Sequence, residues 1–152
     1  MIAVLNGVNL NLLGRRDPAL YGALTLSNLE SRIYQWSRDN GTTARCFQTN
    51  HEGAFVDHLH EAVGWAVHGM VVNPGAWTHY AYAIRDAVEF VVQQGLKVVE
   101  VHLSDIDQRE QFRRHSVIAD VVSHRIKGEG PEGYRHAIEW LTSTAPATPA
   151  IG

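Results

Sequence analysis

The feature that most limits the fold of this chain is an alternation of short β-branched runs with segments whose apolar residues recur at helical spacing. The runs predict five strands, at residues 2–6, 43–49, 69–73, 96–104 and 120–126. The intervening periodicity predicts helices over 27–40, 55–66, 80–95 and 133–141, with a short polar helix near 107–114. A chain of alternating strands and helices favours a parallel sheet with helices on both faces.

Right-handed crossovers restrict such a sheet to few topologies, and a flavodoxin-like doubly wound five-stranded parallel sheet is the architecture we expect. The chain of 152 residues fits one domain. We therefore predict a single α/β domain over residues 1–143. Residues 144–152 are rich in proline and small side chains and predict a flexible C-terminal tail.

Composition excludes several classes of protein. A net charge of −3 provides no basic surface, which argues against nucleic-acid binding. The single cysteine, Cys46, cannot form an internal disulfide, and its strand-like surroundings predict a buried thiol in a reducing compartment. The sequence begins with a strand rather than a signal peptide and has no apolar run long enough to span a membrane. We therefore expect a cytoplasmic protein that needs no membrane.

Polar side chains follow three of the predicted strands at or just beyond the point where each strand ends. In parallel sheets these carboxyl ends share one edge, where ligands bind, so the groups should converge on one crevice. The groups are Asn6 and Asn9 after the first strand, Asn73 and His79 after the third, and Glu100, His102 and Ser104 on or after the fourth. Each could alone be a turn former or a structural residue. Their shared position indicates a functional site.

Glu100 and His102 are two residues apart on a predicted strand and therefore lie on the same face. The carboxylate can hold one ring nitrogen of His102, which leaves the other nitrogen to act as an acid or base near neutral pH. The alternative is a metal site. The sequence has no Cys/His set at zinc spacing, and we predict that no metal is bound.

Arg109 and Arg113 are four residues apart in the predicted helix near 107–114, which would place both guanidinium groups on one face. They follow the strand of His102 and suit an anionic, hydroxylated small molecule. Two other segments resemble functional motifs, but a structural interpretation is simpler for each. Residues 128–133, GEGPEG, match a dinucleotide fingerprint but lack a following βαβ unit, and we interpret them as a glycine turn. In the cluster Asn50–Gly53, we interpret Asn50 or His51 as the start of the second helix.

Several blocks of this sequence resemble type II 3-dehydroquinate dehydratases over roughly residues 2–141. The blocks are NGVNLNLLGRRDPALYG, QTNHEG, NPGAWTH with AIRDA, EVHLSDIDQREQFRRHS and GEGPEGYRHAIEWL. Several ordered blocks at matching separations make the resemblance specific. The departures from the usual family pattern are Val8, Asp17, Tyr80, Tyr82 and Asp105.

The resemblance implies dehydration of 3-dehydroquinate by anti elimination through an enolate, without cofactor or metal. It gives Tyr21 the role of the base that removes the C2 proton, with Arg16 as its activator. It makes His102 the acid for the leaving hydroxyl, oriented by Glu100, and it lets Asn9 hold a water near the enolate oxygen. It places Arg109 on a loop that closes over the site, and it places Asp86 in the site of a neighbouring subunit. It gives substrate binding to Asn73, His79, Leu103, Ser104 and Arg113.

The family resemblance also implies trimers that assemble into a homododecamer.

The role of Tyr21 as a base requires a lowered pKa. An unperturbed tyrosine has a pKa of ~10, and a lowering by about two units requires roughly 2.7 kcal/mol of preferential stabilisation of the phenolate. One guanidinium at about 4 Å from the phenolate could stabilise it by about 4 kcal/mol before the cost of desolvation.

The main alternative to this function is a non-catalytic flavodoxin-like binding or regulatory module, and a second alternative is another small-acid lyase. The sequence does not distinguish a role in the shikimate pathway from one in quinate breakdown.

Overall fold

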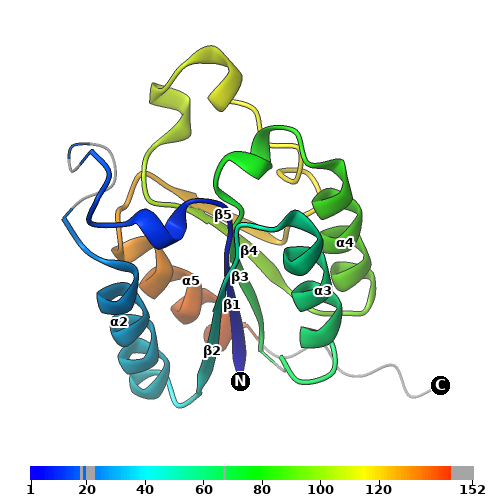
Figure 1. Ribbon diagram of the computed structural model, residues 1–152. Helices are drawn as coiled ribbons and strands as arrows, with labels where there is room; N and C mark the ends of the chain where they lie inside the picture. The colour runs from blue at the N-terminus through cyan, green and yellow to red at the C-terminus, as the bar shows by residue number, and fades with distance from the viewer. Residues whose placement is uncertain (18, 20–22, 67, 145–152) are drawn as a thin grey trace.

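A parallel five-stranded sheet forms the centre of the computed structural model, which describes residues 1–17, 19, 23–66 and 68–144 (Figure 1). The strands are β1 (Ile2–Asn6), β2 (Ala44–Gln48), β3 (Gly69–Asn73), β4 (Val98–His102) and β5 (His124–Lys127). Their spatial order is β2-β1-β3-β4-β5, all parallel. This order is that of flavodoxin-like folds, so the predicted architecture is confirmed.

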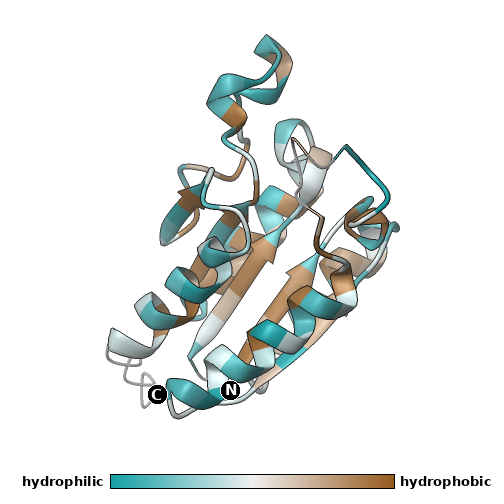
Figure 2. Cartoon of the chain, turned by 90° about the vertical axis from the view of Figure 1, so that its left-hand side faces the viewer, coloured by the Kyte–Doolittle hydropathy of each residue, from teal (hydrophilic) through white to brown (hydrophobic). Residues whose placement is uncertain are grey.

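Helices cover both faces of the sheet (Figure 1). The helices α2 (Leu26–Asp39) and α5 (Glu132–Ser143) lie on one face, and α3 (Glu52–Ala62) and α4 (Tyr82–Gln93) lie on the other. Each pair packs on its own apolar cluster, and all residues of β1, β3 and β4 are buried between the two clusters. Figure 2 shows this apolar centre as brown strands beneath helices with teal outer faces.

The strand register brings the ends of β1 and β3 to one level. Asn6 of β1 lies opposite Asn73 of β3. Val72, the residue before Asn73, lies opposite Glu100 of β4. Side chains that leave these three strands at their carboxyl ends therefore start from adjacent positions. The polar groups that the sequence distributes over about a hundred residues meet at this edge.

The polar segment after β4 differs from its prediction. Instead of one α-helix near 107–114 it forms two 3₁₀ turns, η3 (Ile106–Gln108) and η4 (Gln111–Arg113), separated by extended backbone at Arg109 and Glu110. Of these two turns only η3 buries a residue, Ile106, so no apolar stripe stabilises an α-helix here. Arg109 and Arg113 therefore do not share a helical face, and that prediction is wrong. The segment projects beyond the sheet at the top of Figure 1.

Several element boundaries also differ from the expected ones. The α2 helix begins at Leu26, one residue before the expected start, and is capped by Thr25, whose Oγ1 accepts a hydrogen bond from the Asn28 amide at 3.2 Å. A 3₁₀ turn, η2 (Gly75–His79), precedes α4, and β5 starts at His124 rather than at 120. Apart from Thr144, the predicted flexible tail lies outside the described residues. Within the described ranges, no helix is long and apolar enough to cross a membrane.

Candidate active site

A cavity of about 130 Å³ opens at the carboxyl ends of β1, β3 and β4. Most of the residues that the sequence assigns to the site line it, although they come from four separate segments of the chain. These lining residues are Asn9, Arg16, Asn73, His79, His102, Leu103, Ser104, Arg109 and Arg113. Apolar side chains, including Val8, Leu10 and Ile106, complete the wall.

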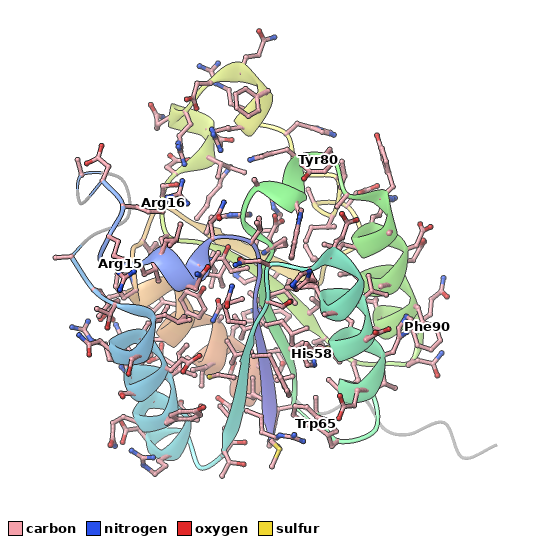
Figure 3. All side chains as sticks on the ribbon, viewed as in Figure 1. Arg15, Arg16, His58, Trp65, Tyr80 and Phe90 are labelled. Atoms are coloured by element: carbon pink, nitrogen blue, oxygen red, sulfur yellow. The ribbon has the colours of Figure 1, made fainter. Side chains whose placement is uncertain are left out.

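The cavity wall is basic. Arg16 comes from the loop after η1 (Leu10–Leu12), and Arg109 and Arg113 come from the projecting segment. In Figure 3, Arg16 lies on the upper side of its loop, whereas Arg15 lies below it beside the start of α2. No described residue that lines the cavity is acidic. Arginine side chains that converge on a small polar cavity suit a ligand that carries a carboxylate.

His102 is the best-positioned acid–base group of the cavity. Its Nε2 lies 2.7 Å from Oε1 of Glu100, and the two side chains are almost completely buried. A carboxylate only accepts hydrogen bonds, so Nε2 carries a proton and Nδ1 is the nitrogen that Glu100 leaves unengaged. This is the arrangement expected from the Glu-x-His spacing. Glu100 itself lies behind His102 and does not line the cavity.

The Glu100 carboxylate is fully buried and held by hydrogen bonds on both oxygens. The Thr78 hydroxyl donates to Oε1 at 2.5 Å, the Ser116 hydroxyl approaches Oε1 and Oε2 at 2.9 and 3.2 Å, and the Arg125 Nε donates to Oε2 at 2.7 Å. Burial raises the pKa of Glu100, but the hydrogen bonds from His102 and Thr78 and the charge of Arg125 outweigh burial and lower the pKa to about 2. Glu100 is therefore an anion throughout the physiological range.

Thr78, Ser116 and Arg125 were not predicted from the sequence. None of them ends a strand, and their common partner is apparent only once β4 and β5 pair with Arg125 directly opposite Glu100. The only available signal was indirect, because a buried carboxylate on a central strand requires donors from neighbouring elements.

His79 belongs to the same wall and has a defined tautomer. Its Nδ1 lies 2.7 Å from the carbonyl oxygen of His115, which can only accept, so Nδ1 carries the proton. Burial lowers the pKa of His79, and the positive charges of His102 and Arg113 lower it further. His79 is therefore neutral at neutral pH, and its Nε2 is left as a hydrogen-bond acceptor.

Asn73 is held by its surroundings before any ligand is bound. Its Nδ2 donates to the Tyr134 hydroxyl at 2.9 Å, and that hydroxyl donates to Oδ1 of Asn6 at 2.6 Å. Oδ1 of Asn73 accepts from the Gly75 amide at 3.1 Å. Asn6 is fully buried and does not line the cavity, so of the two strand-end asparagines only Asn73 borders the site.

The loop after β1 is fixed by β2 and the residues that follow it. Asn9 has a left-handed backbone, with φ of 67°, and its amide donates to Oδ1 of Asn50 at 2.9 Å. The side chain of Gln48 donates to the same Asn50 oxygen and to the Gly7 carbonyl. The cluster Asn50–Gly53 thus includes a residue that positions Asn9, a contact that the sequence pattern does not indicate.

Asp86 is exposed on α4 and, like Asn6 and Glu100, does not line the cavity. Tyr21 lies outside the described residues. The GEGPEG segment forms a turn in which the amides of Gly128 and Gly130 donate to the carbonyls of His102 and Leu103. Across the described part of the chain, no group of His, Cys, Asp and Glu side chains is arranged to hold a metal ion.

Comparison with known proteins adds independent information. Residues 1–142 match the family model described as dehydroquinase class II. A 3-dehydroquinate dehydratase from Bacillus pumilus is 49% identical over 95% of this chain and 95% of its own length. A protein of the same name from Thermotoga maritima is 47% identical over 92% of this chain and 93% of its own.

Solved structures give the same result. The type II dehydroquinase from Propionibacterium acnes superimposes with a TM-score of 0.88 at 40% identity, and covers 94% of this chain and 96% of its own. That from Butyrivibrio crossotus also has a TM-score of 0.88, at 43% identity, and covers 92% and 95%. The similarity extends over almost the whole of each chain.

Proposed function

The chain belongs to the class II dehydroquinase family of hydro-lyases, and we propose that it removes water from 3-dehydroquinate to give 3-dehydroshikimate. The observation that carries this proposal is the basic cavity at the sheet edge, where Glu100 presents the buried ring of His102 beside arginine side chains. The reaction would serve the shikimate pathway or quinate breakdown.

In the proposed first step the phenolate of Tyr21 removes the proton at C2, and the electrons of the C–H bond form an enolate with the neighbouring ketone. Arg16 lines the cavity and would stabilise the phenolate by its charge. Asn9, fixed by Asn50, would hold a water molecule beside the enolate oxygen. These roles rest on the family resemblance together with the position of Arg16 and Asn9 in the cavity wall.

In the second step the enolate electrons form the C1–C2 double bond, the C1–O bond breaks, and His102 protonates the leaving hydroxyl to release water. Donation from Nδ1 requires protons on both ring nitrogens, and the Glu100 carboxylate against Nε2 stabilises that charged form. The other wall residues would bind the carboxylate and hydroxyl groups of the substrate. They are Asn73, His79, Leu103, Ser104, Arg109 and Arg113.

We also propose that the chain self-associates into trimers and a homododecamer and that Asp86 completes the site of a neighbouring subunit. Asp86 is exposed and does not line the cavity of its own chain, which agrees with a role in another subunit. The apolar side chains around it, Ile84, Ala87 and Val88, are buried in the chain's own core and are not available for a subunit contact.

The direct test of function is to incubate the purified protein with 3-dehydroquinate and to follow the conjugated enone by ultraviolet absorbance. We expect turnover without added metal or cofactor, and its loss in His102→Ala. The matched control is His60→Ala, since His60 is an exposed histidine of α3 away from the cavity. Absence of enone with the folded wild-type protein would refute the proposed reaction.

A further inference from the structure

Arg125 lies directly opposite Glu100 on the neighbouring strand, β5. Its Nε donates to Oε2 of Glu100 at 2.7 Å, and its side chain is 29% exposed while that of Glu100 is fully buried. The guanidinium of Arg125 thus reaches a buried carboxylate of the candidate active site. None of the roles assigned above to substrate binding or proton transfer involves it.

The two oxygens of Glu100 have different partners. Oε1 faces His102 and Thr78, whereas Oε2 faces Arg125, with Ser116 close to both oxygens. Arg125 therefore supplies positive charge on the side of the carboxylate that is turned away from His102. The carboxylate is fixed between a permanent cation and a titratable ring.

Arg125 does not border the proposed substrate cavity. Together with Ser116 it lines a second, more open cavity of about 430 Å³, whose wall includes Arg85, Arg114 and His115. His102 lines the first cavity and not the second. The direct contact of Arg125 with the residues of the site is therefore its hydrogen bond to Glu100.

We propose that Arg125 is a positioning residue whose charge offsets that of Glu100 and so allows His102 to release its proton during turnover. A buried carboxylate without a second cation would hold the imidazolium form and weaken it as an acid. With Arg125 present the Glu100–Arg125 pair is neutral, and His102 can alternate between its charged and neutral forms. The role in turnover rests on the proposed function.

The other charged groups around His102 do not replace Arg125. His79 from η2 and Arg113 from η4 both line the cavity; His79 is neutral at neutral pH, and Arg113 lies on the cavity side of the ring rather than beside Oε2. Thr78 and Ser116 donate hydrogen bonds to Glu100 but carry no charge. Removal of Arg125 therefore leaves Glu100 with His102 as its only cationic hydrogen-bond partner among the described residues.

The experiment compares Arg125→Gln and Arg125→Met with Arg125→Lys and the wild type. The His102 ring is followed by NMR in protein that contains ¹³C-labelled histidine, with its signal assigned by its absence in His102→Ala. Turnover of 3-dehydroquinate is measured from pH 5 to 10 on the same preparations. Arg135→Gln is the matched control, because Arg135 pairs with Glu132 and Glu139 on the surface of α5.

In both neutral variants we expect the titration midpoint of His102 to rise by roughly one pH unit, as an uncompensated carboxylate would cause. The alkaline limb of the kcat profile should move in the same direction. At pH values where His102 is protonated in every variant, kcat should be lower in the neutral variants, by at most about tenfold for a one-unit weaker acid, with KM changed little because Arg125 does not line the substrate cavity. In Arg125→Lys the titration midpoint of His102 should lie close to the wild-type value, and Arg135→Gln should match the wild type.

An unchanged His102 midpoint in either folded neutral variant overturns the inference, as does a fall in kcat without any change in the midpoint. Two neutral variants are used so that the failure of one to fold leaves the other to decide. If the wild type does not convert 3-dehydroquinate, the proposed function fails, but the NMR comparison still tests the charge effect. The two proposals can therefore fail independently.

Discussion

The Asn73 side chain donates a hydrogen bond to the hydroxyl of Tyr134, 2.9 Å away and 61 residues later in the chain. Tyr134 is the first residue of α5 to reach through to the ends of β1 and β3, where its hydroxyl also donates to Asn6. Burial raises the pKa of Tyr134 well above the ordinary tyrosine value, so the hydroxyl remains protonated. A wholly buried phenol therefore fixes a side chain of the substrate cavity.

Removal of that hydroxyl should affect both stability and substrate binding. Tyr134→Phe leaves Oδ1 of Asn6 and Nδ2 of Asn73 without the hydroxyl to which they are hydrogen-bonded, which should cost about 1–3 kcal/mol of unfolding free energy. KM should rise because Asn73 is no longer held. Urea unfolding and steady-state kinetics measure the two effects. Tyr82→Phe, which alters an exposed hydroxyl on α4, is the control and should change neither.

The acid limit of stability should depend on Glu100. Its pKa is about 2 in the folded protein and 4.5 ordinarily. The contribution of ionised Glu100 to the free energy of unfolding is therefore complete above pH 4.5 and disappears as the pH falls through about 2. A depression of this size corresponds to about 3 kcal/mol. The difference in unfolding free energy between wild type and Glu100→Gln should therefore be largest near neutrality and shrink toward pH 2. An equal difference at all pH values would contradict the assignment, and the exposed Glu132→Gln is the control.

His102→Ala should lower kcat by about 10²–10⁴-fold, the usual contribution of a positioned general acid. A purely structural histidine would give the opposite pattern, with a lower melting temperature and nearly intact kcat of the folded fraction. Both quantities are measured on one preparation. Because the proposed loss is confined to the transition state, the dissociation constant of the substrate should change far less than kcat.

Tyr21→Phe should lower turnover by several orders of magnitude while calorimetric substrate binding is kept, since the proposed binding groups are elsewhere. Arg16→Ala should move the pH at which activity rises to a higher value, because the phenolate loses a cation. Arg16→Lys should recover only part, as an ammonium lacks the planar donor geometry. Retention of a tenth of wild-type kcat by Tyr21→Phe would show that another group is the base.

A trans contribution of Asp86 can be tested by complementation. Asp86→Ala and His102→Ala should each be nearly inactive alone. In co-expressed mixed oligomers, a subunit with intact His102 can lie beside one with intact Asp86, so activity should return to a fraction of the wild-type value. Light scattering should report oligomers throughout. No recovery in verified mixed oligomers, or a fully active monomer, would exclude the shared site.

The strands, the parallel doubly wound sheet and the edge at which polar groups collect were predictable, because alternating strand and helix patterns leave few topologies for the sheet. Buried β-branched runs specify strands, and Glu100 and His102 share a face by strand geometry alone. The partners of Glu100 were not predictable, since Thr78, Ser116 and Arg125 meet it only through long-range pairing. The polar segment after β4 was also mispredicted, because spacing between arginines does not form a helix without an apolar face.

The loops after β1 and β3 pack closely against each other at two glycines, Gly7 and Gly75. A Cβ on Gly7 would lie 2.5 Å from the Pro74 carbonyl oxygen, and one on Gly75 would lie 2.7 Å from that of Val8. Each loop thus occupies the space that a side chain on the other would need. Over evolutionary time neither loop can change its course alone, so we expect insertions and substitutions near Val8 and near Pro74 to appear together in descendants of this sequence, as paired changes rather than independent ones.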